Sequence, residues 1–370
     1  MIGSGIAGLR AAIHLLDRGD VVLVTKAAGG ESNTGYAQGG IAAALGPDDS
    51  PALHRDDTIE AGAGLCDPAA VEVLVGEGPR YVRELLAWGA AFDREDSGAP
   101  ALGREGAHSV RRVLHARDAT GREIGRTLWA RVVGHPRLRV FENALATGLV
   151  LDAGVCRGAR VLLTGGAILT LEARAVLLAT GGAGQVFSQT TNPVIASGDG
   201  LAMAWRAGAR VSDLEFVQFH PTVLDVRGAP RFLVSEAVRG EGARLLNADG
   251  DAFMARYDAR GDLAPRDVVA TAMVREALAT GQAVSLSLAH LNADWVTGRF
   301  PAIAAACAAA GLDMARDRLP VSPAAHYLCG GVDTDLDGRT SVVGLFAAGE
   351  VACTRVPGAN RPHMLWLPHR

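Results

Sequence analysis

The sequence is poor in several features that mark whole classes of proteins. Its five cysteines are far apart and include no CxxC pair, so neither a disulfide framework nor a metal centre is expected. No apolar run reaches the roughly 18 residues of a membrane-spanning helix, and no basic and then apolar leader opens the chain. The formal net charge of −4 gives no general attraction to nucleic acid or to an anionic membrane. These absences predict a soluble, cytoplasmic protein.

Aromatic residues are also scarce, at 5%, whereas glycine is abundant, with 46 of the 370 residues. Together with 49% hydrophobic residues, this composition is typical of an α/β enzyme with many tight turns. The chain is longer than the size at which one hydrophobic core usually stops growing, so we expect two domains.

Three segments pass from a strand-like apolar run into glycine, at residues 3–8, 176–182 and 345–350. A parallel strand that ends in small residues lets backbone amides approach a pyrophosphate, which then lies at the positive end of the next helix. A single segment of this kind is common and indicates little by itself. Three around one sheet predict a large dinucleotide such as FAD.

The first segment has the GxGxxG spacing, which by itself is a weak signal. A plain NAD site would carry an acidic residue at the end of the second strand, where this chain has Thr25 and Lys26. The residues therefore favour FAD over a nicotinamide nucleotide. Only Met1 and Ile2 precede the motif, which is short for a central strand, so we expect that the natural chain begins further upstream.

The periodicity predicts helices at residues 68–88, 265–279 and 301–310, and a strand hairpin at 140–171. Near residue 213 the sequence changes to polar and charged loops. Strand-like runs return at residues 342–343 and 345–348. The pattern indicates a nucleotide-binding domain that is interrupted by an insertion.

Several polar residues outside the glycine motifs are candidates for chemistry, although each also has a structural explanation. The loop at residues 29–40 is rich in glycine and hydroxyls, and it either wraps a cofactor or is simply exposed. Glu105 lies in a basic stretch that is also typical of a solvated face. His220 ends a strand-like run, where a lone histidine is more often structural.

Arg266 follows a proline at the start of an expected helix, where the helix dipole disfavours a cation, and this indicates an anionic partner. His326 and Arg361 also lie on expected turns. If the fold gathers these residues with His220, they can hold a small dicarboxylate, because a guanidinium group matches a carboxylate with two parallel hydrogen bonds.

The motifs, taken in order, resemble the L-aspartate oxidase family, which groups with the flavin subunits of succinate dehydrogenase and fumarate reductase. The matching blocks are residues 2–9, 36–42, 104–121, 190–207, 215–222, 239–243, 263–269, 323–331 and 349–361. The resemblance implies an α/β fold in which a Rossmann-like FAD-binding domain, residues 1–212 and 328–370, is interrupted by an α+β capping domain, residues 213–327.

The resemblance also implies where FAD lies. The residues expected against it are Gly3, Gly5, Gly8, Lys26, Ser32, Thr34, Gln38, Gly39, Gly40, Asp199 and Glu350. Succinate dehydrogenases attach FAD through a histidine whose position corresponds to Asn33 here. Non-covalent FAD is therefore expected.

The substrate is expected between the flavin and the capping domain. By family motif, its carboxylates are held by His220, Ser235, His326 and Arg361. Glu105 is expected to face the amino group, since a dicarboxylate that also bears an ammonium group needs an acidic partner.

The resemblance assigns proton transfer to Arg266, with Glu236 and Arg239 as a relay. Arginine keeps its proton in nearly every protein, with a pKa above about 12, so electrostatic stabilisation of developing negative charge is the alternative role.

The implied reaction is oxidation of L-aspartate to iminoaspartate, with hydride passing to the flavin and O2 or fumarate as the final acceptor. This is the first step of de novo NAD biosynthesis, and quinolinate synthase is a candidate partner. Two alternatives stay open. They are a soluble fumarate reductase or succinate-oxidising relative, and an inactive flavoprotein.

The family pattern stops after Arg361, and Pro357 stands where the family usually has histidine. Pro362 and Pro368 forbid the helix that follows in the family. From this we expect a truncated or frameshifted product that lacks the family's C-terminal helical domain.

Overall fold

A parallel sheet lies at the centre of the larger lobe in the computed structural model, which describes residues 1–358. Strand β1 (Val21–Val24) pairs with β5 (Leu138–Phe141), and β9 (Val176–Leu178) pairs with β16 (Leu345–Ala347). Ile2 joins the two pairs, because it bridges β1 on one side and β9 on the other. One residue therefore completes the sheet where a first strand was expected.

Helices cover this sheet and supply its core. Helix α1 (Ile6–Leu16) begins at the first glycine motif and packs against α5 (Thr120–Val132), and α4 (Pro68–Ala87) lies beside them. Asp67 caps α4 by accepting hydrogen bonds from two backbone amides in its first turn, next to a proline at the first helical position. This start confirms the helix that was predicted from residue 68.

The remaining elements of this lobe, which we call the nucleotide lobe, are shorter. They are α2 (Asn33–Tyr36), β2 (Ile41–Ala42), α3 (Pro51–Ala61), β3 (Leu102–Gly103), β4 (Val113–Leu114), β6 (Leu145–Asp152), β7 (Val155–Leu162), β8 (Ile168–Glu172), α6 (Asp199–Arg206), β10 (Val211–Ser212), β15 (Gly331–Asp333) and β17 (Ala352–Cys353), with 3₁₀ turns at Gly184–Val186 and Gly349–Val351. The antiparallel β6, β7 and β8 confirm the predicted hairpin.

The expected strand at Val342 and Val343 is wrong. The amide of Val342 donates to the Thr340 hydroxyl at 3.1 Å, and its carbonyl accepts from the Leu345 amide at 3.1 Å. These bonds close a turn, so the strand begins only at Leu345.

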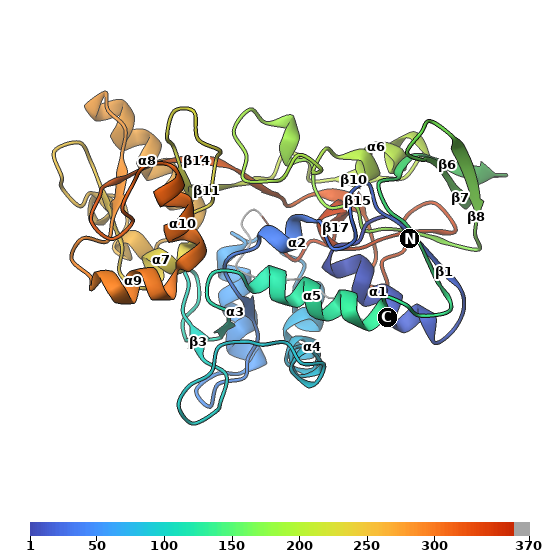
Figure 1. Cartoon of the computed structure of the whole chain (residues 1–370), viewed down its shortest axis with the longest axis horizontal. Helices are drawn as coiled ribbons and strands as arrows, with labels where there is room; N and C mark the ends of the chain where they lie inside the picture. The colour runs from blue at the N-terminus through green and yellow to red at the C-terminus, as the bar shows by residue number, and fades with distance from the viewer. Residues whose placement is uncertain (359–370) are drawn as a thin grey trace.

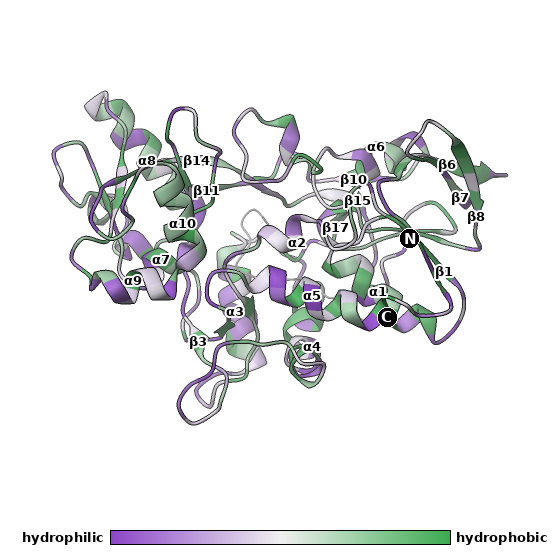
Figure 2. Cartoon of the chain, in the orientation of Figure 1, coloured by the Kyte–Doolittle hydropathy of each residue, from purple (hydrophilic) through white to green (hydrophobic). Residues whose placement is uncertain are grey.

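A second lobe, the capping lobe, is built on a four-stranded antiparallel sheet. The strand order is β11 (Val217–Leu224), β14 (Leu319–Leu328), β13 (Ser285–Ser287) and β12 (Arg244–Leu246). The helices of this lobe are α7 (Glu236–Gly240), α8 (Arg266–Thr280), α9 (Ala293–Arg299) and α10 (Pro301–Ala309), with 3₁₀ turns at Met254–Arg256 and Gly261–Leu263. Figure 2 shows α10 as mostly hydrophobic.

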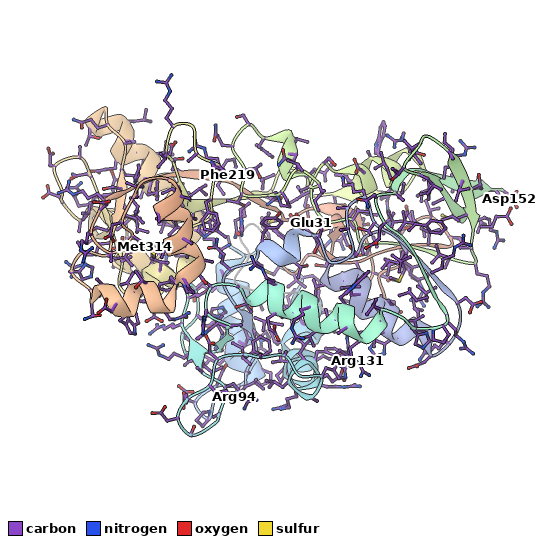
Figure 3. All side chains as sticks on the ribbon, in the orientation of Figure 1. Glu31, Arg94, Arg131, Asp152, Phe219 and Met314 are labelled. Atoms are coloured by element: carbon purple, nitrogen blue, oxygen red, sulfur yellow. The ribbon has the colours of Figure 1, made fainter. Side chains whose placement is uncertain are left out.

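The capping lobe has its own hydrophobic core. Val269, Leu286 and Phe300 are fully buried in it, and every member of this core lies between residues 224 and 321. Met314 of this core and Asp152 at the end of β6 mark opposite ends of the molecule in Figure 3. The lobe is therefore an α+β unit inserted into an α/β lobe, as the sequence predicted.

The two lobes are joined by a pair of neighbouring strands. The chain enters the capping lobe along β11 and leaves it along β14, and the two strands pair from Val217 with Leu328 to Leu224 with Val321 (Figure 1). The first and last residues of the insertion therefore lie side by side at the nucleotide lobe, and this places the residues of β11 and β14 beside the site described next.

Candidate cofactor and substrate site

The three glycine motifs meet at one place. Ala7, Ala179 and Ala348, one from each motif, form a small buried cluster. Gly3 has a φ of +110°, and a Cβ there would lie 2.1 Å from the Ala179 carbonyl oxygen, so only glycine fits. A Cβ at Gly8 would lie 2.1 Å from the Gly3 carbonyl oxygen. Gly8 thus allows close packing of helix on strand and does not itself line the cavity.

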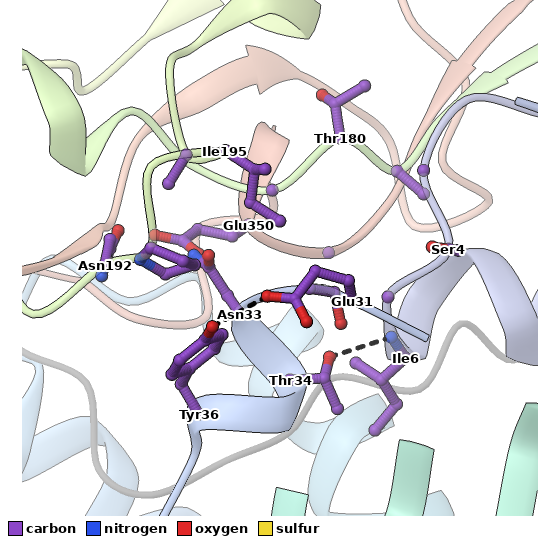
Figure 4. Close-up of a pocket in the computed structure, with 18 of the residues that line it drawn as sticks. Ser4, Ile6, Glu31, Asn33, Thr34, Tyr36, Thr180, Asn192, Ile195 and Glu350 are labelled. Carbon is purple, nitrogen blue, oxygen red and sulfur yellow. Dashed lines mark hydrogen bonds between the residues drawn. The ribbon is translucent and has the colours of Figure 1, made fainter. Parts of the chain in front are cut away.

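A cavity opens at these motifs, between the sheet, α2, α6 and the loop at residues 191–196. Figure 4 shows part of its lining, with Ser4 and Thr34 on one side and Asn192 and Ile195 on the other. Every residue expected against FAD lines it except Gly8. These residues are Gly3, Gly5, Lys26, Ser32, Thr34, Gln38, Gly39, Gly40, Asp199 and Glu350.

The start of α1 forms an anion-binding end of this cavity. Gly5 is the N-cap residue and gives no side-chain cap, and the first turn contains no acidic residue. The Ile6 amide donates to the Thr34 hydroxyl at 3.1 Å, as Figure 4 shows. An 11-residue helix that begins at a glycine turn facing the cavity suits a pyrophosphate. At the rim, Lys26 forms an ion pair with Asp199.

Glu350 connects the cavity to the capping lobe. Its Oε2 accepts from Asn33 Nδ2 at 3.2 Å, and its Oε1 accepts from the backbone amide of Leu328 at 3.0 Å. Leu328 is the last residue of β14. The third glycine motif therefore holds the end of the strand that carries His326.

A buried charged cluster lies on the capping side, and we call it the cap cluster. Arg266 donates from Nε to Glu236 Oε2 at 2.6 Å and from Nη1 to Gln218 Oε1 at 2.8 Å. Glu236 Oε1 accepts from the Gly106 amide at 2.9 Å and lies 3.7 Å from Arg239 Nη2. All four of these side chains are buried. Gly106 belongs to the nucleotide lobe, so the cluster spans both lobes.

Two histidines connect the cap cluster to the cavity. The rings of His220 and His326 are in contact, with centroids 5.2 Å apart, and His326 lines the cavity. Nδ1 of His326 lies 2.7 Å from the Thr191 hydroxyl, which helps to fix the ring. A molecule in the cavity beside His326 therefore also reaches the edge of the cap cluster.

His220 has a defined protonation state. Burial, and after it the charge of Arg266, lowers its pKa well below the ordinary 6.5, so the ring is neutral at pH 7. The Thr222 amide donates to Nδ1 at 3.3 Å, which leaves the proton on Nε2. Nε2 has no hydrogen-bond partner among residues 1–358. His220 thus presents an unused, fully buried donor.

The structure brings most of the predicted substrate residues together. Glu105 is buried and directly precedes Gly106 at the cap cluster. Ser235 caps α7 by accepting from the Ala237 amide at 3.2 Å, one residue before Glu236. Arg361 lies outside the described residues. Its expected role stays a prediction.

Sequence reasoning missed three residues of the site: Gln218, Thr191 and Asn192. Gln218 and His220 share one face of β11, so period-two alternation could have identified Gln218. Thr191 and Asn192 lie in a loop, and Asn192 Nδ2 donates to the His326 carbonyl at 2.8 Å. No periodic signal marks such loop contacts. None of the helices within residues 1–358 combines the length and the apolar character that a membrane span requires.

Comparisons with known proteins agree with this geometry. Residues 1–362 match the FAD binding domain family. The chain is 49% identical to an L-aspartate oxidase of Synechocystis, over 98% of this chain and 66% of that protein. It is 52% identical to an L-aspartate oxidase of Streptomyces coelicolor, over 98% of this chain and 64% of that protein.

Solved structures show the same fold. The quinol fumarate reductase chain FrdA of E. coli matches with a TM-score of 0.92 at 33% identity, over 97% of this chain and 65% of that chain. The chain thus spans just under two thirds of the length of these relatives.

Proposed function

The chain belongs to the FAD-binding flavoproteins, and among them to the L-aspartate oxidase family, and from this premise we propose that it oxidises L-aspartate to iminoaspartate. The final electron acceptor in this proposal is O2 or fumarate. The observation that carries the proposal is the Nε2 donor of His220, which has no hydrogen-bond partner among residues 1–358 and is buried next to a histidine of the cofactor cavity. A carboxylate is the partner that suits such a donor beside Arg266.

The residues of the cavity fit FAD. The start of α1, where Gly5 gives no side-chain cap, suits the pyrophosphate, and three glycine turns allow the close approach that a dinucleotide needs. When bound, FAD supplies the acceptor for the hydride. We propose that it is held without a covalent bond. Asn33 stands where the resemblance places the linking histidine, and its amide already donates to Glu350.

The cap cluster then binds and polarises the substrate. His220 donates from Nε2 to one carboxylate, and His326 lies beside it at the cavity wall. The guanidinium of Arg266 donates from Nε to Glu236 Oε2 at 2.6 Å, and an arginine side chain is a donor that does not act as a base in proteins. We therefore assign Arg266 to the stabilisation of negative charge that develops on the substrate, in place of proton abstraction.

Glu105 decides between L-aspartate and succinate in this proposal. Its carboxylate is buried at the nucleotide-lobe side of the cap cluster, where a substrate ammonium group gains a charged hydrogen bond. Succinate has no group for this partner.

The test is a flavin spectrum recorded without oxygen. The purified chain, reconstituted with FAD, is mixed with L-aspartate or with succinate, and the absorbance of oxidised flavin is followed. Bleaching by L-aspartate alone is the expected result, and Glu105→Gln should lose most of this preference. Bound flavin that succinate bleaches equally well would favour a fumarate reductase instead, and bound flavin that neither reduces would contradict both.

Acid precipitation of the same sample tests the mode of attachment, since non-covalent FAD is released into the supernatant. The first step of NAD biosynthesis, a cytoplasmic location and association with quinolinate synthase remain predictions that rest on the family resemblance.

A further inference from the structure

Helix α10 begins without a polar cap from its own segment. Its N-cap residue is Phe300, which gives no side-chain cap, and Pro301 follows. The preceding helix α9 shows the usual arrangement, because Asn292 caps it by accepting from the Trp295 amide at 2.9 Å. The buried start of α10 therefore needs a hydrogen-bond acceptor from elsewhere in the protein.

Asp118 of the nucleotide lobe provides that acceptor. Its Oδ2 accepts from the Ile303 amide at 2.8 Å, and both residues are buried. A carboxylate at this end of a helix also interacts favourably with the helix dipole. Figure 1 shows the segment that enters α5 next to α10, in agreement with this contact. The helix of one lobe is thus capped by a side chain of the other.

The neighbouring residue strengthens the same contact. Arg117 has a φ of +49°, which is unfavourable for a residue other than glycine. Its amide donates to Asp93 Oδ2 at 2.7 Å, and its carbonyl accepts from Arg299 Nη1 of the capping lobe at 3.0 Å. The unfavourable backbone conformation is therefore held from both sides, and one of the two bonds crosses between the lobes.

The same segment also reaches the cofactor cavity. Thr120 and Gly121 line it, two and three residues after Asp118. The Gly121 amide donates to the Ala37 carbonyl at 2.8 Å, and a Cβ at Gly121 would lie 1.8 Å from the Thr34 carbonyl oxygen. The segment is therefore fixed against the wall of the cavity, and it has little freedom to follow the capping lobe if that lobe moves away.

We propose that Asp118 is a positioning residue that holds the capping lobe closed over the cofactor cavity. With Arg117 and Arg299 it forms a latch between the lobes, in addition to the connection through β11 and β14. The latch keeps His326, which lines the cavity, and the neighbouring His220 in place. Only this catalytic consequence rests on the proposed function, since the contact itself joins the lobes whatever the substrate is.

Hydrogen exchange of the Gly106 amide tests the latch. This amide donates to Glu236 across the lobes, away from Asp118, so its exchange rate reports opening. Asp118→Ala removes the cap between the lobes. There are two controls: Asp118→Asn keeps a hydrogen-bond acceptor, and Asn292→Ala removes a cap within the capping lobe. A lost cap of about 1 kcal/mol corresponds to about fivefold faster exchange.

Asp118→Ala should therefore speed exchange at Gly106 about fivefold, with FAD content unchanged, and lower kcat/KM for L-aspartate by at most that factor, since kcat/KM follows the closed fraction. Asp118→Asn should behave as the natural protein. Asn292→Ala should lower thermal stability while leaving Gly106 exchange and kcat/KM unchanged. If Asp118→Ala does not fold, Arg299→Ala removes the second bond between the lobes and should act in the same direction.

Two results would overturn the latch. The first is that the Gly106 amide exchanges no faster in Asp118→Ala than in Asn292→Ala. If only Arg299→Ala folds, the same comparison is made with that variant. The other is Asp118→Asn exchanging as fast as Asp118→Ala. The exchange measurement needs no substrate, so it decides this proposal even if the chain does not oxidise L-aspartate.

Discussion

Replacing Arg266 by leucine separates its chemical role from its structural one. The guanidinium is buried and bonds to both Glu236 and Gln218, so its loss removes positive charge from the place where the proposed reaction develops negative charge. Loss of one preorganised donor of this kind lowers turnover by at least about a hundredfold. FAD should stay bound, because Arg266 does not line the cofactor cavity.

The same substitution should also destabilise the fold. Glu236 would keep its bond to the Gly106 amide but lose its ion pair with Arg266, and Arg239 Nη2 lies 3.7 Å away. Breaking a buried ion pair by removing one partner costs about 3–5 kcal/mol. Adding Glu236→Gln removes the unbalanced charge while it keeps an oxygen for the Gly106 amide. The double variant should regain most of the lost stability and none of the lost turnover.

The assays are thermal unfolding, flavin absorbance and steady-state oxidation of L-aspartate on each variant. Arg256→Leu is the matched control, since Arg256 pairs with Glu276 in the same lobe but outside the cap cluster, and it should leave turnover unchanged. Turnover of Arg266→Leu within tenfold of the natural protein, with FAD bound, would remove Arg266 from the site. If adding Glu236→Gln restored turnover, the role of Arg266 would be limited to folding.

Three further predictions concern the cavity, the substrate and pH. Gly3→Ala should abolish FAD binding, measured as the flavin-to-protein absorbance ratio, because its Cβ would lie 2.1 Å from a carbonyl oxygen, whereas Gly125→Ala, with open space around it, should not. His220→Ala should raise KM for L-aspartate about tenfold or more in steady-state assays, since a hydrogen bond to a charged group is lost. Burial lowers the pKa of His54 to about 4. The stability that the neutral ring of His54 contributes is therefore complete above the unfolded pKa of 6.5 and is lost as the pH falls towards 4. The free energy of unfolding, measured with denaturant, should change less between pH 7 and pH 5 in His54→Gln than in the natural protein.

The sequence predicted the parts of the fold that local patterns encode. Strands that end in glycine must place their carboxyl ends at one edge of a parallel sheet, and Ala7, Ala179 and Ala348 do meet there. The start of α4 was readable from Asp67 and Pro68. The role of Ile2 could not be predicted, because a single residue that pairs with two strands leaves no periodic pattern in the sequence.

Contacts between the lobes were the part that the sequence could not give. Asp118 and Ile303 are 185 residues apart, and nothing in the sequence around either residue identifies the other as its partner. The bond between Gly106 and Glu236 spans 130 residues. Helical and strand periodicity report only which face of an element is buried, so they carry no information about which distant element covers that face.

The cap cluster is better explained by chemistry than by stability. Buried ion pairs often contribute no more to stability than hydrophobic residues of the same shape, provided that all their donors are matched. Arg112 shows the matched case, since its guanidinium bonds to both Asp49 and Asp57. In the cap cluster, by contrast, Nε and Nη2 of Arg239 and Nε2 of His220 have no hydrogen-bond partner among the described residues.

Unmatched donors of this kind also occur on Arg10, but that guanidinium lies 4.7 Å from the ring centroid of Tyr81 and 4.9 Å from that of Trp88, so aromatic faces compensate it. No aromatic ring stacks on Arg239 within residues 1–358. A buried donor without any partner costs about 1–3 kcal/mol, and a charged one costs more. Arg239 is partly compensated, because Glu236 Oε1 lies 3.7 Å from its Nη2 and the Asp262 carbonyl accepts from its Nη1. Nε2 of His220 has no such compensation among residues 1–358, and a carboxylate of the proposed substrate is an acceptor that would complete it.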